Sequence, residues 1–210
     1  MRAIRHWVGL ENERVRLAWA TMEAPLVQFG NIHLPYLPFP ETIDPEVSNP
    51  ATVYSWALNN IWDTNFPPRQ QGEMEFSYAV ASGEDTQTPE LGMRTASALT
   101  TPLLGILSAQ SAESHFPEQG SFCSVDHPRI DVIALMPSRR GHDLTVMLQS
   151  LSSENEEVGV SFGLLRAARG WVGSHLEKNL EEVRVDGENV RFVVPAGSLV
   201  SLAVDLERGR

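Results

Sequence analysis

Apolar and polar residues alternate with a period of two through much of the chain, which is typical of half-buried β-strands. In the first part of the chain this pattern predicts strands over residues 14–22, 25–37, 52–58 and 73–82. The last stretch, EMEFSYAVAS, separates its side chains most clearly into two opposite faces: Met74, Phe76, Tyr78 and Val80 against Glu73, Glu75 and Ser77. Prolines at positions 35, 38, 40, 45 and 50 exclude a helix there and predict an irregular connection.

The pattern changes after residue 83, where good helix formers follow a Thr-Pro step. Thr88 is a suitable N-cap and Pro89 fits the first helical position, so we predict one short helix that ends near Thr100. Residues 103–121 are mixed and polar and show neither period, which favours a linker.

Strand patterns return in the last part of the chain, in stretches separated by turn residues: 129–137, 143–151, 157–165, 180–187, 189–197 and 198–206. The sequence DGEN at residues 186–189 favours a tight turn between two of them. Several short strands without helical periodicity indicate a small antiparallel β-sandwich. The whole pattern predicts an all-β protein with antiparallel sheets and one or two short helices.

The balance of charges excludes some partners. The chain carries 16 basic and 27 acidic residues, a formal net charge of −11, whereas proteins that bind nucleic acid or anionic membranes need a basic surface. We therefore expect neither as a partner. The single cysteine, Cys123, excludes an internal disulfide, and the N-terminus lacks an apolar run of signal-peptide length. These features favour a cytoplasmic location.

Residues able to hold a metal or act as a nucleophile are scattered. The six histidines include no pair at metal-ligand spacing, and the chain has neither a GxSxG sequence nor a glycine-rich phosphate loop. We predict no metal site and no catalytic residue within the chain. Glu154, Glu156 and Glu157 in SSENEEVG are interpreted as a solvated turn, and Arg166 and Arg169 as a solvated face.

Polar side chains crowd around one tryptophan in the segment NNIWDTNFPPRQQG, residues 59–72. Aromatic rings beside amides, a carboxylate and a guanidinium suit a sugar, which has an apolar ring face and hydroxyl groups at its rim. The alternative role is structural, because loop carboxylates and amides more often hold the backbone and tryptophans more often pack in a core. The residues that could contact carbohydrate or a neighbouring domain are Trp56, Asn59, Asn60, Trp62, Asp63, Asn65, Arg69 and Gln70.

Several phrases occur in an order that resembles the C-terminal part of bacterial-type glycoside hydrolase family 38 α-mannosidases: RHWVGLEN, VRLAWATMEAPLVQFG, YSWALNNIWDTNF and FSYAV. In that family a phrase close to SW-x-x-NN-x-W-x-TNF precedes a Q-x-G step and a strand that ends in F-x-Y. The matching positions here are Ser55, Trp56, Asn59, Asn60, Trp62, Thr64, Asn65, Phe66, Gln70 or Gln71, Gly72, Phe76 and Tyr78. The closing strand pair agrees as well, with Leu176, Glu177 and Pro195 at matching places.

The resemblance implies a non-catalytic role. Members of this family are zinc-dependent retaining α-mannosidases whose nucleophilic Asp and zinc ligands lie in an N-terminal α/β domain. By this resemblance, residues 1–102 are the C-terminal part of a large β-sandwich of the galactose-mutarotase type, 103–121 a linker and 122–210 a small β-sandwich. No cofactor is expected in this chain. The expected partners are the zinc-holding catalytic domain, mannose-containing carbohydrate and, through exposed strand edges, a second copy.

Two other functions stay open. A stand-alone carbohydrate-binding module would use Trp56, Trp62 and the neighbouring amides as its platform. A sugar epimerase or mutarotase-like enzyme would need a histidine and a glutamate that meet in one pocket. His33 and Glu75 are the candidates near the motif, and fold analogy alone supports this reading.

Overall fold

The computed structural model describes residues 2–30, 51–58, 65, 67, 69–107, 117–178, 181–186 and 189–207. Strands dominate this part of the chain, every strand pair is antiparallel, and the described residues contain one α-helix. The all-β prediction is therefore confirmed. The chain divides into two compact units, Met1–Leu104 and Gly105–Arg210.

The elements of the first unit are β1 (Arg2–Ala3), β2 (Trp7–Glu11), β3 (Arg16–Thr21), β4 (Leu26–Phe29), β5 (Val53–Ser55), β6 (Tyr78–Gly83) and α1 (Thr88–Thr100). Those of the second unit are β7 (Ser124–Val125), β8 (Ile130–Pro137), β9 (Leu144–Ser150), β10 (Glu156–Ser161), β11 (Ala167–Ser174), β12 (Glu181–Asp186), β13 (Asn189–Val194) and β14 (Leu199–Leu206). The described parts of the predicted linker, 103–107 and 117–121, contain neither helix nor strand.

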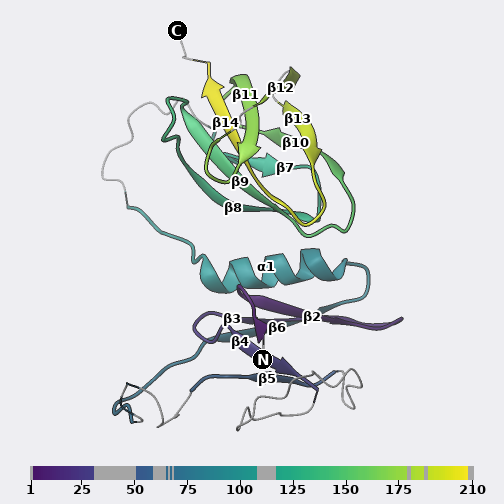
Figure 1. The fold of residues 1–210 in the computed structure, drawn as a ribbon, viewed down its shortest axis with the longest axis vertical. Helices are drawn as coiled ribbons and strands as arrows, with labels where there is room; N and C mark the ends of the chain where they lie inside the picture. Colours follow the sequence, from purple (N-terminus) through teal and green to yellow (C-terminus); the bar gives the residue numbers. More distant parts are fainter. Residues whose placement is uncertain are drawn as a thin grey trace. The chain divides into compact units, whose positions relative to one another are not determined.

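The first unit is layered. Its strands form two three-stranded sheets, in the orders β1-β4-β5 and β2-β3-β6. Helix α1 packs on one face of the β2-β3-β6 sheet, and the β1-β4-β5 sheet lies on the opposite side of that sheet (Figure 1). One face of the β2-β3-β6 sheet is therefore covered by α1.

Small side chains allow α1 to lie close to this sheet. Ala18 and Ala20 of β3 are fully buried, and the register places Gly9 of β2 and Ala81 of β6 on either side of Ala18. Side chains directly opposite one another in antiparallel strands point to the same face. The helix therefore rests on a floor of alanine and glycine.

The start of α1 differs from the prediction by one position. Gln87 is the N-cap, and it makes no side-chain hydrogen bond to the helix, whereas Thr88 is already helical. The Thr88 hydroxyl donates instead to the carboxylate of Glu11 in β2. The Thr88 side chain therefore contacts strand β2 and does not cap the helix as the sequence predicted. The predicted end at Thr100 is confirmed.

Strand β6 is shorter than the alternating pattern predicts. The strand begins at Tyr78, so residues 73–77 are not part of it. The backbone N–H of Ser77 donates to the Glu23 carboxylate at 2.7 Å, and its carbonyl accepts from the Met22 N–H at 3.2 Å. The Ser77 N–H therefore donates to the Glu23 side chain, whereas in a longer β6 it would donate to a backbone carbonyl of the neighbouring strand.

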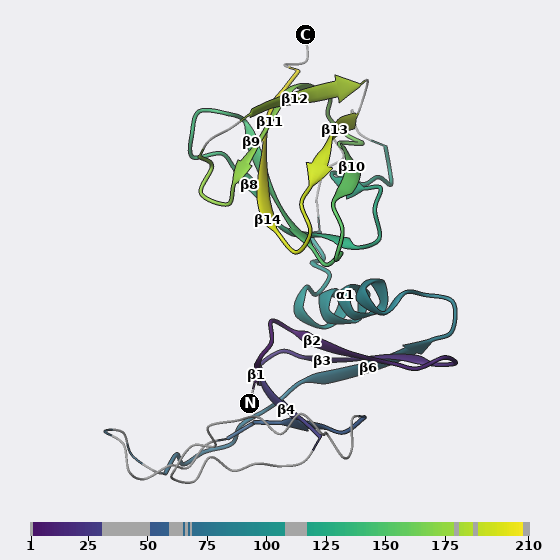
Figure 2. The same cartoon turned by 45° about the vertical axis from the view of Figure 1, so that its right-hand side comes forward.

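The second unit is a single curled sheet. Its eight strands follow the order β7-β10-β13-β12-β11-β14-β9-β8. The sheet curls round on itself (Figure 2), and its two edge strands, β7 and β8, contact each other. The curl encloses a core of alternate, inward-facing side chains: Ile130, Val146, Leu148, Val158, Val160, Phe162, Ala167, Val190, Phe192, Val194, Val200, Leu202 and Val204.

Most strands of this unit agree with the sequence patterns to within a few residues, and β12 and β13 pair antiparallel up to Asp186 opposite Asn189, on either side of the predicted DGEN turn. The exceptions are the two-residue β7, which was not predicted, and β11, a strand where a solvated face was expected. The centre of β11 is Gly170, where an added Cβ would lie 2.7 Å from a methyl carbon of Val190. This close packing requires glycine, and glycine lowers strand propensity. The strand is therefore hard to recognise from the sequence.

Within the described residues, no helix has both the length and the apolar character that crossing a bilayer requires.

Candidate functional site

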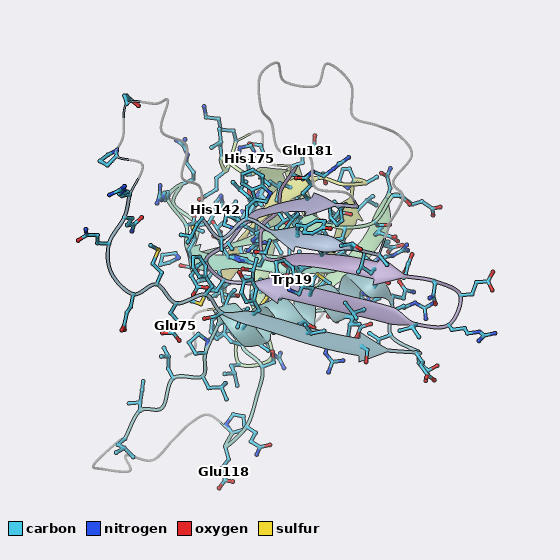
Figure 3. The ribbon with its side chains drawn as sticks, turned by 90° about the horizontal axis from the view of Figure 1, so that it is seen from below. Trp19, Glu75, Glu118, His142, His175 and Glu181 are labelled. Carbon is cyan, nitrogen blue, oxygen red and sulfur yellow. The ribbon has the colours of Figure 1, made fainter. Side chains whose placement is uncertain are left out.

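The motif that carries the family resemblance has its two ends in contact. Ser55 is the last residue of β5 and Tyr78 the first of β6, and Ser55 Oγ lies 3.1 Å from the Tyr78 hydroxyl. The Tyr78 ring also stacks on Trp19 of β3, with ring centroids 5.3 Å apart and an interplanar angle of 29°. We call Ser55, Tyr78 and Trp19 the loop base. It lies where the chain leaves the β1-β4-β5 sheet after Ser55 and where it enters the β2-β3-β6 sheet at Tyr78; Trp19 is labelled in Figure 3.

Trp56 continues the strand geometry of the loop base. Its backbone N–H donates to the carbonyl of Leu26 at 2.9 Å, and its side chain is half-buried. Of the other predicted contact residues, Asn65, Arg69 and Gln70 are exposed. Asn59, Asn60, Trp62 and Asp63 lie outside the described residues, so their predicted role stays a prediction.

The loop base offers aromatic and hydroxyl groups and contains no carboxylate, histidine or cysteine. Tyr78 remains 42% exposed, and one phenol, one indole and one serine hydroxyl can together contact a polar partner or a sugar rim. The epimerase hypothesis needs His33 and Glu75 in one pocket. Glu75 is exposed, and His33 lies outside the described residues, so this pairing stays a prediction. The geometry therefore suits positioning a loop.

Glu156 in the second unit collects several partners. Its carboxylate accepts from Ser152 Oγ, from Arg129 at 2.7 Å and from His127 Nε2 at 3.2 Å, and its side chain is 15% exposed. The Ser152 hydrogen bond, helped by the neighbouring His127 and by the Arg129 guanidinium and opposed by burial, holds the pKa of Glu156 below its ordinary value. The interpretation of Glu156 as part of a solvated turn is therefore wrong.

Both ring nitrogens of His127 in this network contact other residues of the chain. The Arg129 backbone N–H donates to His127 Nδ1 at 3.3 Å, so Nε2 carries the hydrogen that it donates to Glu156. Both ring nitrogens are thus engaged, and neither is free to take a proton from a substrate. The network joins the start of β8 to the start of β10.

A second cluster covers the outer face of β11 and β14. His142 Nδ1 lies 3.0 Å from Asp205 Oδ1, and the His142 ring centroid lies 4.3 Å from that of Trp171. Arg169 is placed 4.8 Å from the centre of the same indole and bonds to Glu182 at 2.9 Å. That hydrogen bond lowers the pKa of Glu182 and raises the pKa of Arg169. Arg169 is exposed, as predicted, although it lies on an unpredicted strand.

This second cluster lacks the third member of a catalytic triad. A carboxylate that orients a histidine is useful when the histidine activates a nucleophile, but the described residues place no serine, threonine or cysteine in hydrogen-bond contact with His142. Cys123 lies elsewhere, at the start of the second unit, and burial raises the pKa of its thiol. A raised pKa keeps the thiol protonated and poorly nucleophilic.

Among the described residues, no three or more histidine, cysteine, aspartate and glutamate side chains come together as a metal ion would require. No protein-family model matches the chain, and no curated protein matches it.

Sequence reasoning missed the contacts that define these clusters. Ser55 and Tyr78 are 23 positions apart, and His142 and Asp205 are 63 apart. Contacts at such separations depend on strand register, and no local spacing signals them.

Proposed function

We propose that this chain is the non-catalytic C-terminal β region of a zinc-dependent α-mannosidase similar to the bacterial-type members of glycoside hydrolase family 38, and that it acts in the cytoplasm. The observation that carries the proposal is the closed loop base. The family-like phrase begins at Ser55 and ends at Tyr78, and these two residues contact each other. The two ends of the phrase therefore meet at a fixed base.

The architecture supports an accessory role for residues 56–77. An all-β chain in two units is the arrangement that the resemblance implies after the catalytic and helical domains. The clusters that could resemble active sites, around Glu156 and His142, are occupied by internal hydrogen bonds and ring contacts. In this proposal the nucleophile and the zinc ion come from the catalytic domain, and residues 56–77 contribute contacts to that domain and to mannose-containing carbohydrate.

Complementation tests this proposal. The full chain is added to the isolated catalytic domain of a family 38 α-mannosidase, and zinc-dependent hydrolysis of an aryl α-mannoside is measured together with complex formation. We expect a complex and a rise in activity. A matched variant replaces residues 59–72 with a short Gly-Ser linker, which the closed loop base allows, and should bind less well while keeping its fold. Absence of any association at high micromolar concentration would contradict the proposal.

A stand-alone carbohydrate-binding module is the alternative. The half-buried Trp56 and the 42% exposed Tyr78 could present aromatic edges to a sugar without a partner domain. Titration of the chain with mannose and manno-oligosaccharides, followed by tryptophan fluorescence, separates the two functions. Saturable binding by the chain alone favours the module, whereas an unchanged signal up to millimolar sugar removes it.

A further inference from the structure

Strand β6 forms an unusually open edge in the first unit. It pairs with β3 over its full length, from Tyr78 opposite Thr21 to Gly83 opposite Arg16. No described strand pairs with its other side, and it ends the order β2-β3-β6 (Figure 3). An edge of this kind presents a row of backbone N–H and C=O groups to any strand that can align with it.

The other sheet edges in the described residues carry the devices that normally prevent such pairing. Three of them are only two or three residues long: β1, β5 and β7. Strand β8 contains Pro137 and a register shift between Val132 and Ala134, and β2 ends in the charged Glu11. Short length, proline, irregular register and charge all protect an edge.

β6 has none of these protections. Its six residues, YAVASG, include no proline and no charge, and its register with β3 is regular. Val80 at its centre is 64% exposed and lies on the same face as Tyr78. An added strand would place its own apolar side chains beside Val80, because neighbouring side chains on one face of a sheet pack together.

Charge determines which strand fits. Exposed acids lie on both sides of β6 along the chain, Glu73 and Glu75 before it and Glu84 and Asp85 after it. Arg16, on the β3 side, is engaged with the carbonyl oxygen of Glu84. Two copies joined antiparallel through β6 would bring the acids before one strand near the acids after the other. The formal charge of −11 per chain adds to that repulsion.

We infer that the outer edge of β6 binds a polypeptide strand by β-strand addition, and that this strand has a neutral, β-branched centre with lysine or arginine on both flanks. Backbone hydrogen bonds supply the binding, and the acidic residues around β6 select the basic flanks. This inference goes beyond the proposed function, because it describes the strand by its chemistry whichever protein carries it.

The test uses the full chain and a fluorescent peptide of alternating threonine and valine with a pair of lysines at each end, followed by fluorescence anisotropy. We expect saturable binding and slower amide hydrogen exchange confined to residues 78–83. The same peptide with glutamates in place of the lysines should bind at least about tenfold more weakly, because like charges across an interface are costly. A version N-methylated at alternate residues should not bind, because its backbone donors are blocked.

Two matched variants locate the site. Val80→Lys should weaken binding at least about tenfold, whereas Val193→Lys changes an exposed valine on β13, a strand paired on both sides, and should leave binding unchanged. Both valines are more than half exposed, so circular dichroism should show both variants folded.

Three results would overturn the inference: no binding of the lysine-flanked peptide, equal binding of all three peptides, or a dimer of the chain alone that Val80→Lys dissolves. No mannosidase component enters this assay. A negative peptide-binding result therefore does not affect the complementation test of the proposed function. A negative complementation result likewise does not affect the peptide-binding test.

Discussion

Gly92 sets the distance between α1 and the strands beneath it. A Cβ at this position would lie 2.2 Å from Cε3 of the Trp7 indole. Glycine is a poor helix residue, about 1 kcal/mol less favourable than alanine in a helix interior. Glycine at position 92 therefore lowers helix propensity but allows the helix backbone to pack directly against the Trp7 ring.

We predict that Gly92→Ala destabilises the first unit although alanine favours the helix. Overpacking of a core typically costs about 1–3 kcal/mol, which exceeds the propensity gain. Chemical denaturation of the variant should show a lower free energy of unfolding. Ser97→Ala, at an exposed position of the same helix, is the control and should be neutral or slightly stabilising. A more stable Gly92→Ala variant would show that the indole moves aside freely.

Glu156 gives the second unit a dependence on pH. Because hydrogen bonds and nearby charges lower its pKa in the folded state, its stabilisation is complete above the pKa of the unfolded chain. It is lost as the pH falls through the lower, folded-state pKa. We predict that Glu156→Gln lowers the Tm by several degrees at pH 7 and that the difference from the unmodified chain shrinks as the pH falls toward 3.

Thermal unfolding followed by circular dichroism across this pH range measures the effect. Glu157→Gln, on the same strand but exposed, is the matched control and should change the Tm little at any pH. A Tm difference for Glu156→Gln that stays constant from pH 7 to pH 3 would rule out the ionised carboxylate as the source.

The loop base couples two elements that belong to different sheets. Ser55 ends β5 and Tyr78 starts β6, so the hydrogen bond between them ties the β1-β4-β5 sheet to the β2-β3-β6 sheet. A double-mutant cycle with Ser55→Ala and Tyr78→Phe should give a coupling of about 1 kcal/mol, the usual net value for one such hydrogen bond.

Urea denaturation of the four proteins in this cycle supplies the coupling. Tyr54→Phe removes a hydroxyl from the neighbouring position of β5 and serves as the control, which should show no coupling to Ser55→Ala. Purely additive effects of the two loop-base substitutions would mean that the contact does not fasten the sheets together.

Elements with clean alternation were predictable, and elements fixed by close packing were not. The stretch 189–197 predicted β13, which runs from Asn189 to Val194, because its buried and exposed residues alternate along the strand. β11 was missed because Gly170 and Gly173 interrupt the apolar alternation that marks a strand. Close packing against Val190 requires glycine at position 170. The start of α1 moved because Thr88 bonds to a distant glutamate.

The candidate site was predictable only in part. The resemblance pointed to the segment that starts at Ser55, yet the contact of its ends and the stacking of Tyr78 on Trp19 depend on the register of β3 with β6. The Glu156 network likewise joins residues 27 and 29 positions apart, to Arg129 and His127. Such contacts are set by which strands pair, and single-sequence periodicity does not encode that choice.

At the scale of the whole molecule, each compact unit has its own buried residues. Leu202 is fully buried in the core of the second unit, and Leu202→Ala should cost that unit about 2–5 kcal/mol. We predict that hydrogen exchange read by mass spectrometry will accelerate in peptides from residues 123–206 and not in peptides from the first unit. The control is Leu199→Ala, at an exposed position of the same strand. Acceleration in both units would show that they unfold as one.

The measurement that tests the central claim most directly is the nucleotide sequence immediately upstream of the first codon in the source genome. An accessory region of an α-mannosidase predicts a reading frame that continues upstream without a stop and encodes an α/β domain with an aspartate nucleophile and His/Asp zinc ligands, or an adjacent gene that encodes such a domain. An in-frame stop codon directly upstream, with no such domain encoded beside it, would contradict the claim and leave the chain to function by itself.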